Sequence, residues 1–218
     1  MPNFNITIWQ APGRRGIGEN PSGFIKAVEI KPGDTAALAA AVEFDNCPGL
    51  YKGGYRTGEN FQKANFILAD IDNKHSDDPA EWRDHNDVIA AMPGVAFYCY
   101  PSRNNMKEKD GRSPRPKEHY IFPIDETTDA GEYAGYMKWL IEAFPELHFD
   151  EVVKSAAQLN FGVENPQVIY MPGTMNLSEY IRDFRSNPSE SNAAKIRRIL
   201  SEGLIIPEGE RDNTLNVG

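Results

Sequence analysis

Runs of apolar residues, separated by polar and Gly/Pro-rich stretches, predict strands and helices along the chain. The clearest element is a strand over 65–72, NFILADID, in which four apolar residues in a row are followed by apolar residues alternating with acids. That pattern indicates a buried strand whose far end emerges at a surface. Further strands are expected over 5–9, 24–30, 95–100, 118–124 and 167–170.

Helices are predicted where apolar residues recur at helical spacing behind a capping residue. The expected caps are Asp34, Asp78 and Asp129. The helices follow them over 35–44, 79–92 and 130–144, with others over 149–162, 178–185 and 191–202. Strands and helices alternate without a strict βαβ order. The predicted fold class is therefore α+β, with a mixed or antiparallel central sheet and flanking helices.

The longest interruption in this pattern is a polar stretch of about seventeen residues, SRNNMKEKDGRSPRPKE, between two predicted strands. Six basic residues against three acidic ones give it a local charge of about +3. A loop of that length without apolar content is usually functional or mobile. The alternative is a solvated insertion that binds nothing.

Composition places the chain among ordinary globular proteins. Its 218 residues are 40% hydrophobic and 25% charged, which excludes collagen-like, coiled-coil and fully disordered classes. The formal charge of −9 argues against a protein that coats nucleic acid by bulk charge, because such binding depends on Lys and Arg. Any contact with nucleic acid is therefore expected to be local.

No stretch approaches the roughly 20 apolar residues of a membrane helix, and the first residues lack the order of a secretory signal. We therefore expect a cytosolic (cytoplasmic) protein that does not associate with membranes. Cys47 and Cys99 have no CxxC partner and no nearby His, so both are expected in the core.

Asp70 and Asp72 are the first candidates for chemistry. They lie two apart at the end of the predicted strand 65–72, so both side chains project from the same face. Two adjacent carboxylates repel unless a cation lies between them. Oxygen ligands of this kind fit Mg²⁺ or Mn²⁺. The alternative is that the acids simply close the strand before a turn.

Three further residues could complete such a site. Lys117 and His119 would share a face of the strand after the polar loop, where both could bind phosphate. Asp150, in the apolar setting HFDEVV, is a third carboxylate of the kind that a site for two divalent ions requires.

The order of these motifs resembles the catalytic core of the archaeo-eukaryotic primase superfamily, and most closely the primase-polymerase (PrimPol) domains of phages, plasmids and other mobile elements. FILADIDN matches the first motif, EHYIFPI the second and FDEVV the third, and YMPGTMN is similar to the Pro-Gly-Thr stretch that often follows. The resemblance covers roughly 60–180. The chain departs from the family at Lys117, where Ser is common, and at Gln158, where an Arg often follows the third motif.

The resemblance implies template-directed nucleotidyl transfer, as a DNA primase or DNA polymerase, in replication of a mobile element. It implies an RRM-like catalytic domain over 1–186 and a small C-terminal helical segment over 187–218 that precedes a helicase region. The implied cofactors are two divalent ions, Mg²⁺ or Mn²⁺. The implied partners are a DNA template, dNTP or NTP substrates and a helicase domain.

It also implies roles for individual residues. The metal ligands would be Asp70, Asp72 and Asp150, with His119 as a further catalytic residue. Nucleotide contacts are expected from Ser102, Arg103, Arg115, Lys117 and His119, and DNA contacts from Lys107, Lys109, Arg112 and Arg115. Two other functions remain open: a metal-dependent nuclease, in which Lys117 would assist, and a non-catalytic module that binds an origin or single-stranded DNA and delivers a helicase.

Overall fold

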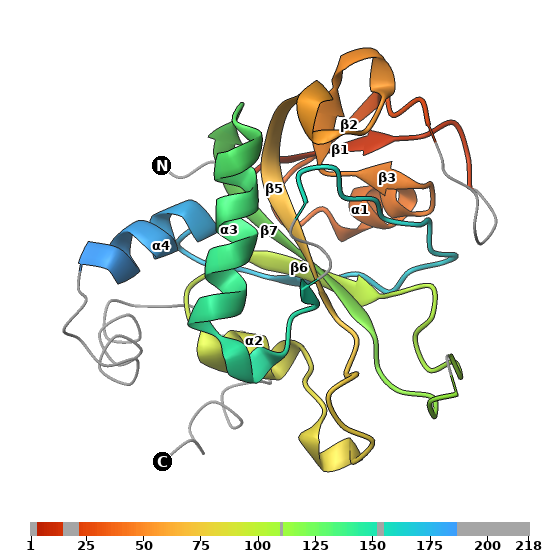
Figure 1. The fold of residues 1–218 in the computed structure, drawn as a ribbon, viewed down its shortest axis with the longest axis vertical. Helices are drawn as coiled ribbons and strands as arrows, with labels where there is room; N and C mark the ends of the chain where they lie inside the picture. Colours follow the sequence, from red (N-terminus) through yellow and green to blue (C-terminus); the bar gives the residue numbers. More distant parts are fainter. Residues whose placement is uncertain (1–3, 15–21, 110, 152–154, 187–218) are drawn as a thin grey trace.

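A five-stranded antiparallel sheet, in the order β4-β5-β7-β6-β8, forms the centre of the protein (Figure 1). The computed structural model describes residues 4–14, 22–109, 111–151 and 155–186. The central strands are β4 (Gly49–Tyr51), β5 (Phe61–Ile71), β6 (Phe97–Pro101), β7 (Glu118–Thr127) and β8 (Ile169–Met171). A second antiparallel sheet, in the order β2-β1-β3, contains β1 (Ile6–Gln10), β2 (Lys26–Ile30) and β3 (Asn46–Cys47).

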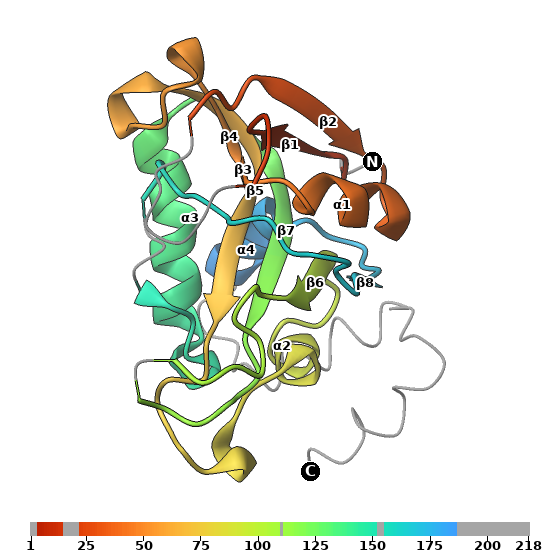
Figure 2. The ribbon, with the colours of Figure 1, turned by 90° about the vertical axis from the view of Figure 1, so that its right-hand side faces the viewer.

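Different layers cover the two faces of the central sheet (Figures 1 and 2). The helices α2 (His85–Ala91), α3 (Ala130–Ala143) and α4 (Leu177–Ser186) pack on one face, and α1 (Thr35–Val42) and the N-terminal sheet pack on the other. Alternation along β5 supplies both layers, since Ile67 and Ala69 face the helices while Phe66 and Leu68 face the N-terminal sheet. The predicted α+β class with antiparallel sheets and flanking helices is confirmed.

The long strands β5 and β7 are paired in the middle of the sheet and fix the relative positions of the acidic and basic motifs. Their register sets Asp70 opposite His119 and Leu68 opposite Ile121. Cys47 and Cys99 are both buried, Cys99 among the helix-facing residues of the central sheet and Cys47 in a smaller cluster with Phe24 and Tyr51, which confirms the core prediction for the cysteines.

The helix expected over 79–92 is shorter than predicted. A 3₁₀ turn occupies Pro79–Glu81, and α2 begins only after Asp84, whose side chain forms a capping box with Asp87. The residues between them have other partners: the Trp82 side chain donates from Nε1 to Ser76 O, and the main-chain Arg83 N donates to the side chain of Asn73.

The helix predicted over 149–162 is wrong for its described part. Asp150 N donates to Asp70 O and Asn160 forms an isolated bridge with Asn46, so main-chain groups of this segment bond to the two sheets instead of to each other. The helix expected over 191–202 and the C-terminal segment 187–218 lie outside the described residues. Within the described ranges, no helix combines the length and apolar character that crossing a membrane requires.

Candidate active site

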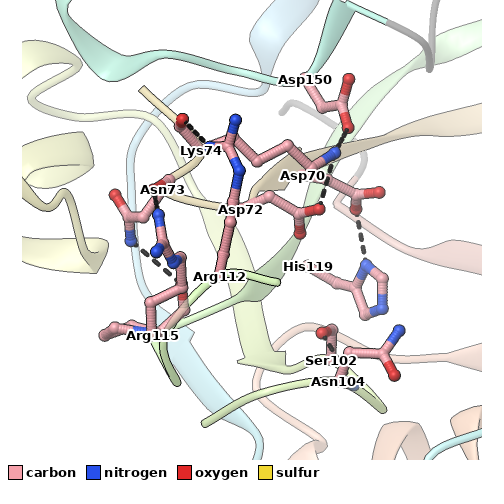
Figure 3. Close-up of polar contacts among 11 residues, drawn as sticks. Asp70, Asp72, Asn73, Lys74, Ser102, Asn104, Arg112, Arg115, His119 and Asp150 are labelled. Carbon is pink, nitrogen blue, oxygen red and sulfur yellow. Dashed lines mark hydrogen bonds and ion pairs between the residues drawn. The ribbon is translucent and has the colours of Figure 1, made fainter. Parts of the chain in front are cut away.

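The site forms at the end of β5, where the loop that follows β5 meets the polar loop between β6 and β7 (Figures 1 and 2). Asp70 is two positions after Leu68 and so lies on the face of β5 that packs against the N-terminal sheet. His119 of β7 is its register partner, and His119 Nδ1 lies 2.6 Å from Asp70 Oδ1 (Figure 3). The Asp70 carboxylate therefore orients the imidazole ring, as such pairs do in many active sites.

Asp150, which is far from Asp70 in the sequence, is placed beside the end of β5 by main-chain contacts. Phe149 forms an isolated antiparallel bridge with Ile71, and Asp150 N donates to Asp70 O at 2.8 Å. This segment thus pairs with the end of β5, and the pairing fixes the main-chain position of Asp150. The main chains of Asp70 and Asp150, two of the three predicted carboxylates, are therefore adjacent.

A lysine lies between two of these carboxylates. Lys74 Nζ is 2.9 Å from Asp72 Oδ2 and 2.7 Å from Asp150 Oδ2 (Figure 3). Burial disfavours the ammonium form, but the hydrogen bonds to Asp150 and Asp72 outweigh it and raise the pKa of Lys74. The two carboxylates therefore already share one positive charge.

The donor chemistry fits a hard divalent ion. Three carboxylates supply the oxygens that Mg²⁺ and Mn²⁺ prefer, and the Lys74 ammonium marks a place where a cation is stabilised. Lys74 lies between Asp72 and Asp150, and Asp70 is paired with His119. In this arrangement, the described ranges contain no group of three His, Cys, Asp or Glu side chains placed to bind one metal ion. The residues that would hold a metal are Asp70, Asp72 and Asp150.

Hydrogen bonds of buried polar side chains stabilise the turn after Asp72. Asn73 has a left-handed backbone, with φ 50°, and its side chain donates to Arg83 O and Pro116 O. Arg115 Nη1 donates to Asn73 O and Ser76 O. These contacts fix the chain reversal that directs Lys74 back towards Asp72.

Arg115 is therefore a correction to the sequence interpretation. Its side chain is 1% exposed, and its guanidinium also pairs with Asp77 and with Ser113. An arginine in this position has no surface to offer to a nucleotide or to DNA. The structure makes it a support for the turn between β5 and α2.

Lys117 and Ser102 lie next to each other at the start of β7 and the end of β6. Ser102 N donates to Lys117 O at 2.8 Å, and Lys117 N donates to Asn105 Oδ1 at 2.9 Å. Lys117 is 6% exposed, and burial lowers its pKa against the opposing charge of Asp72. Lys117 therefore brings a positive charge close to Asp72.

Arg103 lies in a basic cavity on the other side of the polar loop. Its guanidinium stacks 4.9 Å from the centre of the Phe161 ring, donates to Gly162 O and pairs with the buried Asp45 at 3.4 Å. The cavity has a volume of about 640 Å³ and is lined by Arg14, Ser102, Arg103, Asn105, Lys107 and Glu164, among others. It is large enough for part of a nucleotide and carries a positive balance.

A second cavity, of about 520 Å³, opens over the carboxylates and is lined by Asp72, Lys74 and Asp150. At its rim the rings of His75 and His148 stack with their centres 3.7 Å apart. Asp72 and Asp150 are therefore reached from solvent through this cavity. The basic cavity that contains Arg103 is a separate one.

The remaining predicted contacts lie on the exposed part of the polar loop. Lys107, Lys109 and Arg112 are exposed, and Lys109 and Arg112 bridge across the loop tip. Arg112 Nη1 also donates to Lys74 O and so joins this loop to the one after β5 (Figure 3). Gln158, at the position where the family often has Arg, is buried and donates to Leu68 O, so it supports β5.

Sequence reasoning missed Lys74, Asn73 and Asp45. Lys74 had a readable signal, because it continues the spacing of two that joins Asp70 to Asp72. Asn73 and Asp45 had none, since their importance comes from burial among residues distant in sequence.

No family model and no curated protein matches this chain. A solved structure to which it is similar is the AEP domain of the cyanophage S-2L primase-polymerase (PrimPol). The identity is 14%, the match covers 82% of this chain and 87% of that one, and the TM-score is 0.42. A likeness of that size carries no argument about function, so the proposals below rest on the residues of this chain.

Proposed function

We propose that the protein is a metal-dependent nucleotidyltransferase that extends or starts nucleic-acid chains on a DNA template, as a primase or polymerase. One observation carries the proposal: Asp72 and Asp150, from two distant segments, both contact the Lys74 ammonium, near the Asp70–His119 pair. The order of the motifs around these residues supports the same function. The template, the dNTP or NTP substrates, a helicase partner, a role in replication of a mobile element and a cytosolic location belong to this proposal.

Each residue then has a task that its geometry supports. Asp70, Asp72 and Asp150 would hold Mg²⁺ or Mn²⁺, whose chemistry is to neutralise the triphosphate and activate the attacking 3′-hydroxyl. His119, oriented by Asp70, presents its other ring nitrogen for hydrogen bonding to a phosphate. Lys117 supplies a fixed positive charge beside it. Transfer of a nucleotidyl group depends mainly on such positioning and charge neutralisation.

The basic cavity is the proposed place for the nucleotide or the template strand. Arg103 cannot move freely, because Asp45 and Gly162 hold its guanidinium against Phe161. A pre-organised arginine loses little conformational entropy when it binds an anion. Ser102 and Lys107 line the same cavity and would add polar contacts.

A metal-dependent nuclease is the second candidate, and Lys117 is the observation that favours it. Burial lowers the pKa of this lysine, so its side chain gives up a proton more easily than an exposed lysine. A lysine of that kind beside metal-binding carboxylates can assist attack by water.

Incubation of the protein with a labelled primer–template, dNTPs and Mn²⁺ separates the candidates. Extension supports the polymerase, and shortening without dNTPs supports the nuclease. Asp72→Asn should lower the extension rate by at least about 100-fold, because it removes a charged metal ligand. The control is Glu59→Gln, an exposed acid of the turn Gly58–Asn60, which should extend as well as the wild type.

Extension by Asp72→Asn at the rate of the control would show that the metal assignment is wrong. If the wild-type protein neither extends nor shortens DNA with Mg²⁺ or Mn²⁺, both enzyme proposals fail. DNA binding that persists in that case, unaffected by Asp72→Asn, would indicate the non-catalytic module.

A further inference from the structure

The Lys74 ammonium lies between two of the three carboxylates that would hold a metal. It contacts Asp72 and Asp150 at 2.9 and 2.7 Å, within the cavity that opens over the site. A single positive charge leaves the three carboxylates with a net negative charge. The site is thus held together without a metal and still attracts one.

The main chain at Lys74 is fixed while its side chain is not. Asn73 is buried in the left-handed conformation and bonded to both flanking loops, and Lys74 O accepts from Arg112. The Lys74 side chain is half-exposed, at 50%, and its four-carbon stem borders an open cavity. The ammonium can therefore leave the carboxylates without unfolding the turn.

Lys117 differs from Lys74 in this respect. It is nearly buried, at 6% exposed, whereas the side chain of Lys74 is half-exposed. Of these two lysines, Lys74 is the one placed to move. A divalent ion between Asp72 and Asp150 would repel the ammonium at contact distance, so the two cations exclude each other.

We propose that Lys74 is an internal counter-ion that a divalent metal displaces, and that the displaced ammonium pairs with a phosphate of the bound nucleotide. Metal and nucleotide then strengthen each other's binding through one side chain, because the metal releases the ammonium and the phosphate receives it. This inference rests on the proposed function and assigns the coupling to Lys74.

Metal binding itself, measured without turnover, tests the proposal. Free Mn²⁺ is followed by electron paramagnetic resonance during titration of the wild-type protein and Lys74→Met, alone and with a non-hydrolysable dNTP analogue. Lys74→Met should bind Mn²⁺ alone about tenfold more tightly, the scale of two half-exposed ion pairs. The factor by which the analogue strengthens Mn²⁺ binding should fall in Lys74→Met.

The matched control is Lys63→Met. Lys63 lies on the same strand as Asp70 and also pairs with an acid, Glu126, at 2.9 Å, but it is at the other end of β5. Its replacement should leave Mn²⁺ affinity unchanged, with or without the analogue.

The outcomes separate this inference from the function on which it rests. Equal Mn²⁺ affinity and equal enhancement by the analogue in wild type and Lys74→Met would overturn the role of Lys74 and leave the metal site standing. If the wild-type protein binds no Mn²⁺, or binds it as tightly after Asp72→Asn, the metal site itself fails, and the inference with it.

Discussion

Arg115 and Asn73 determine the shape of the acidic site although neither can touch a substrate. Asn73 takes a backbone conformation that most residues avoid, and Arg115 bonds its carbonyl group and that of Ser76. Residues that support a turn in this way position the side chains on it. We infer that the geometry at Asp72 and Lys74 depends on this pair.

Arg115→Met should therefore reduce stability. The change leaves buried carbonyl groups without their charged donor, and we expect the free energy of unfolding to fall by about 2–3 kcal/mol. Urea denaturation followed by circular dichroism measures the loss. Lys109→Met, in the exposed part of the same loop, should change it by about 0.5 kcal/mol or less. Equal stability of Arg115→Met and the wild-type protein would contradict this account.

At the scale of single residues, sequence identified charge but not burial. Asp70 and His119 were predicted in one site and lie opposite each other, because the register of the paired strands β5 and β7 determines their positions. Asp150 reaches the same region through the bridge between Phe149 and Ile71. Arg115 could not be distinguished from its exposed neighbours. Its burial results from contacts with a loop some forty residues earlier in the chain.

At the scale of elements, two glycines differ in whether the structure has room for a side chain at their position. Gly162 lies where a Cβ would be 2.3 Å from Glu43 O, and its amide donates to the buried Asp45. Gly135 lies in the exposed side of α3, with no atom within 4 Å of the place of its Cβ. The absence of a side chain at Gly162 lets its segment approach Glu43, at the end of α1, closely. Gly135 has no such role and only lowers the stability of α3.

The same substitution at these positions should have opposite effects. Gly162→Ala forces the backbone apart and should lower the free energy of unfolding by about 2–3 kcal/mol. Gly135→Ala should raise it by about 0.5–1 kcal/mol, because alanine is the better helix former. Urea denaturation of both variants checks the signs, and a stabilising Gly162→Ala would show that the close approach is not required.

Most elements could be predicted from sequence because their own residues determine them. The strand over 65–72 and the helix after Asp129 correspond to β5 and α3, with boundaries shifted by a few residues. The helix predicted over 79–92 begins only at His85, because Trp82 and Arg83 bond to Ser76 and Asn73. The helix over 149–162 failed because both sheets bind its backbone. Long-range partners of this kind leave no local pattern.

Across the whole molecule, the net charge of −9 coexists with a local basic region. The exposed polar loop carries Lys107, Lys109 and Arg112, and the basic cavity beside it contains Arg103. The proposed binding of DNA by so small a region would involve few phosphates and should depend only moderately on salt.

We expect the logarithm of the DNA association constant to fall with the logarithm of salt concentration with a slope of about −2 to −3, as for three or four phosphates on single strands. Fluorescence anisotropy with labelled DNA measures it. Replacing Lys107, Lys109 and Arg112 by Gln should flatten the slope by about 2. Replacing three lysines outside that loop, the exposed Lys52 and Lys138 and the half-buried Lys63, should not flatten the slope, and an equal effect of both sets would refute a local DNA surface.

The bridge between Ile71 and Phe149 has a consequence for the order in which the protein is made and folds. It closes a loop that contains β6, β7 and α3, and the entropy of closing so long a loop is regained only when those elements have packed. A chain still leaving the ribosome has Asp70 and Asp72 long before Asp150. The three carboxylates proposed to hold a metal are thus assembled only after the elements between them have packed, so the proposed site would not form on an incomplete chain.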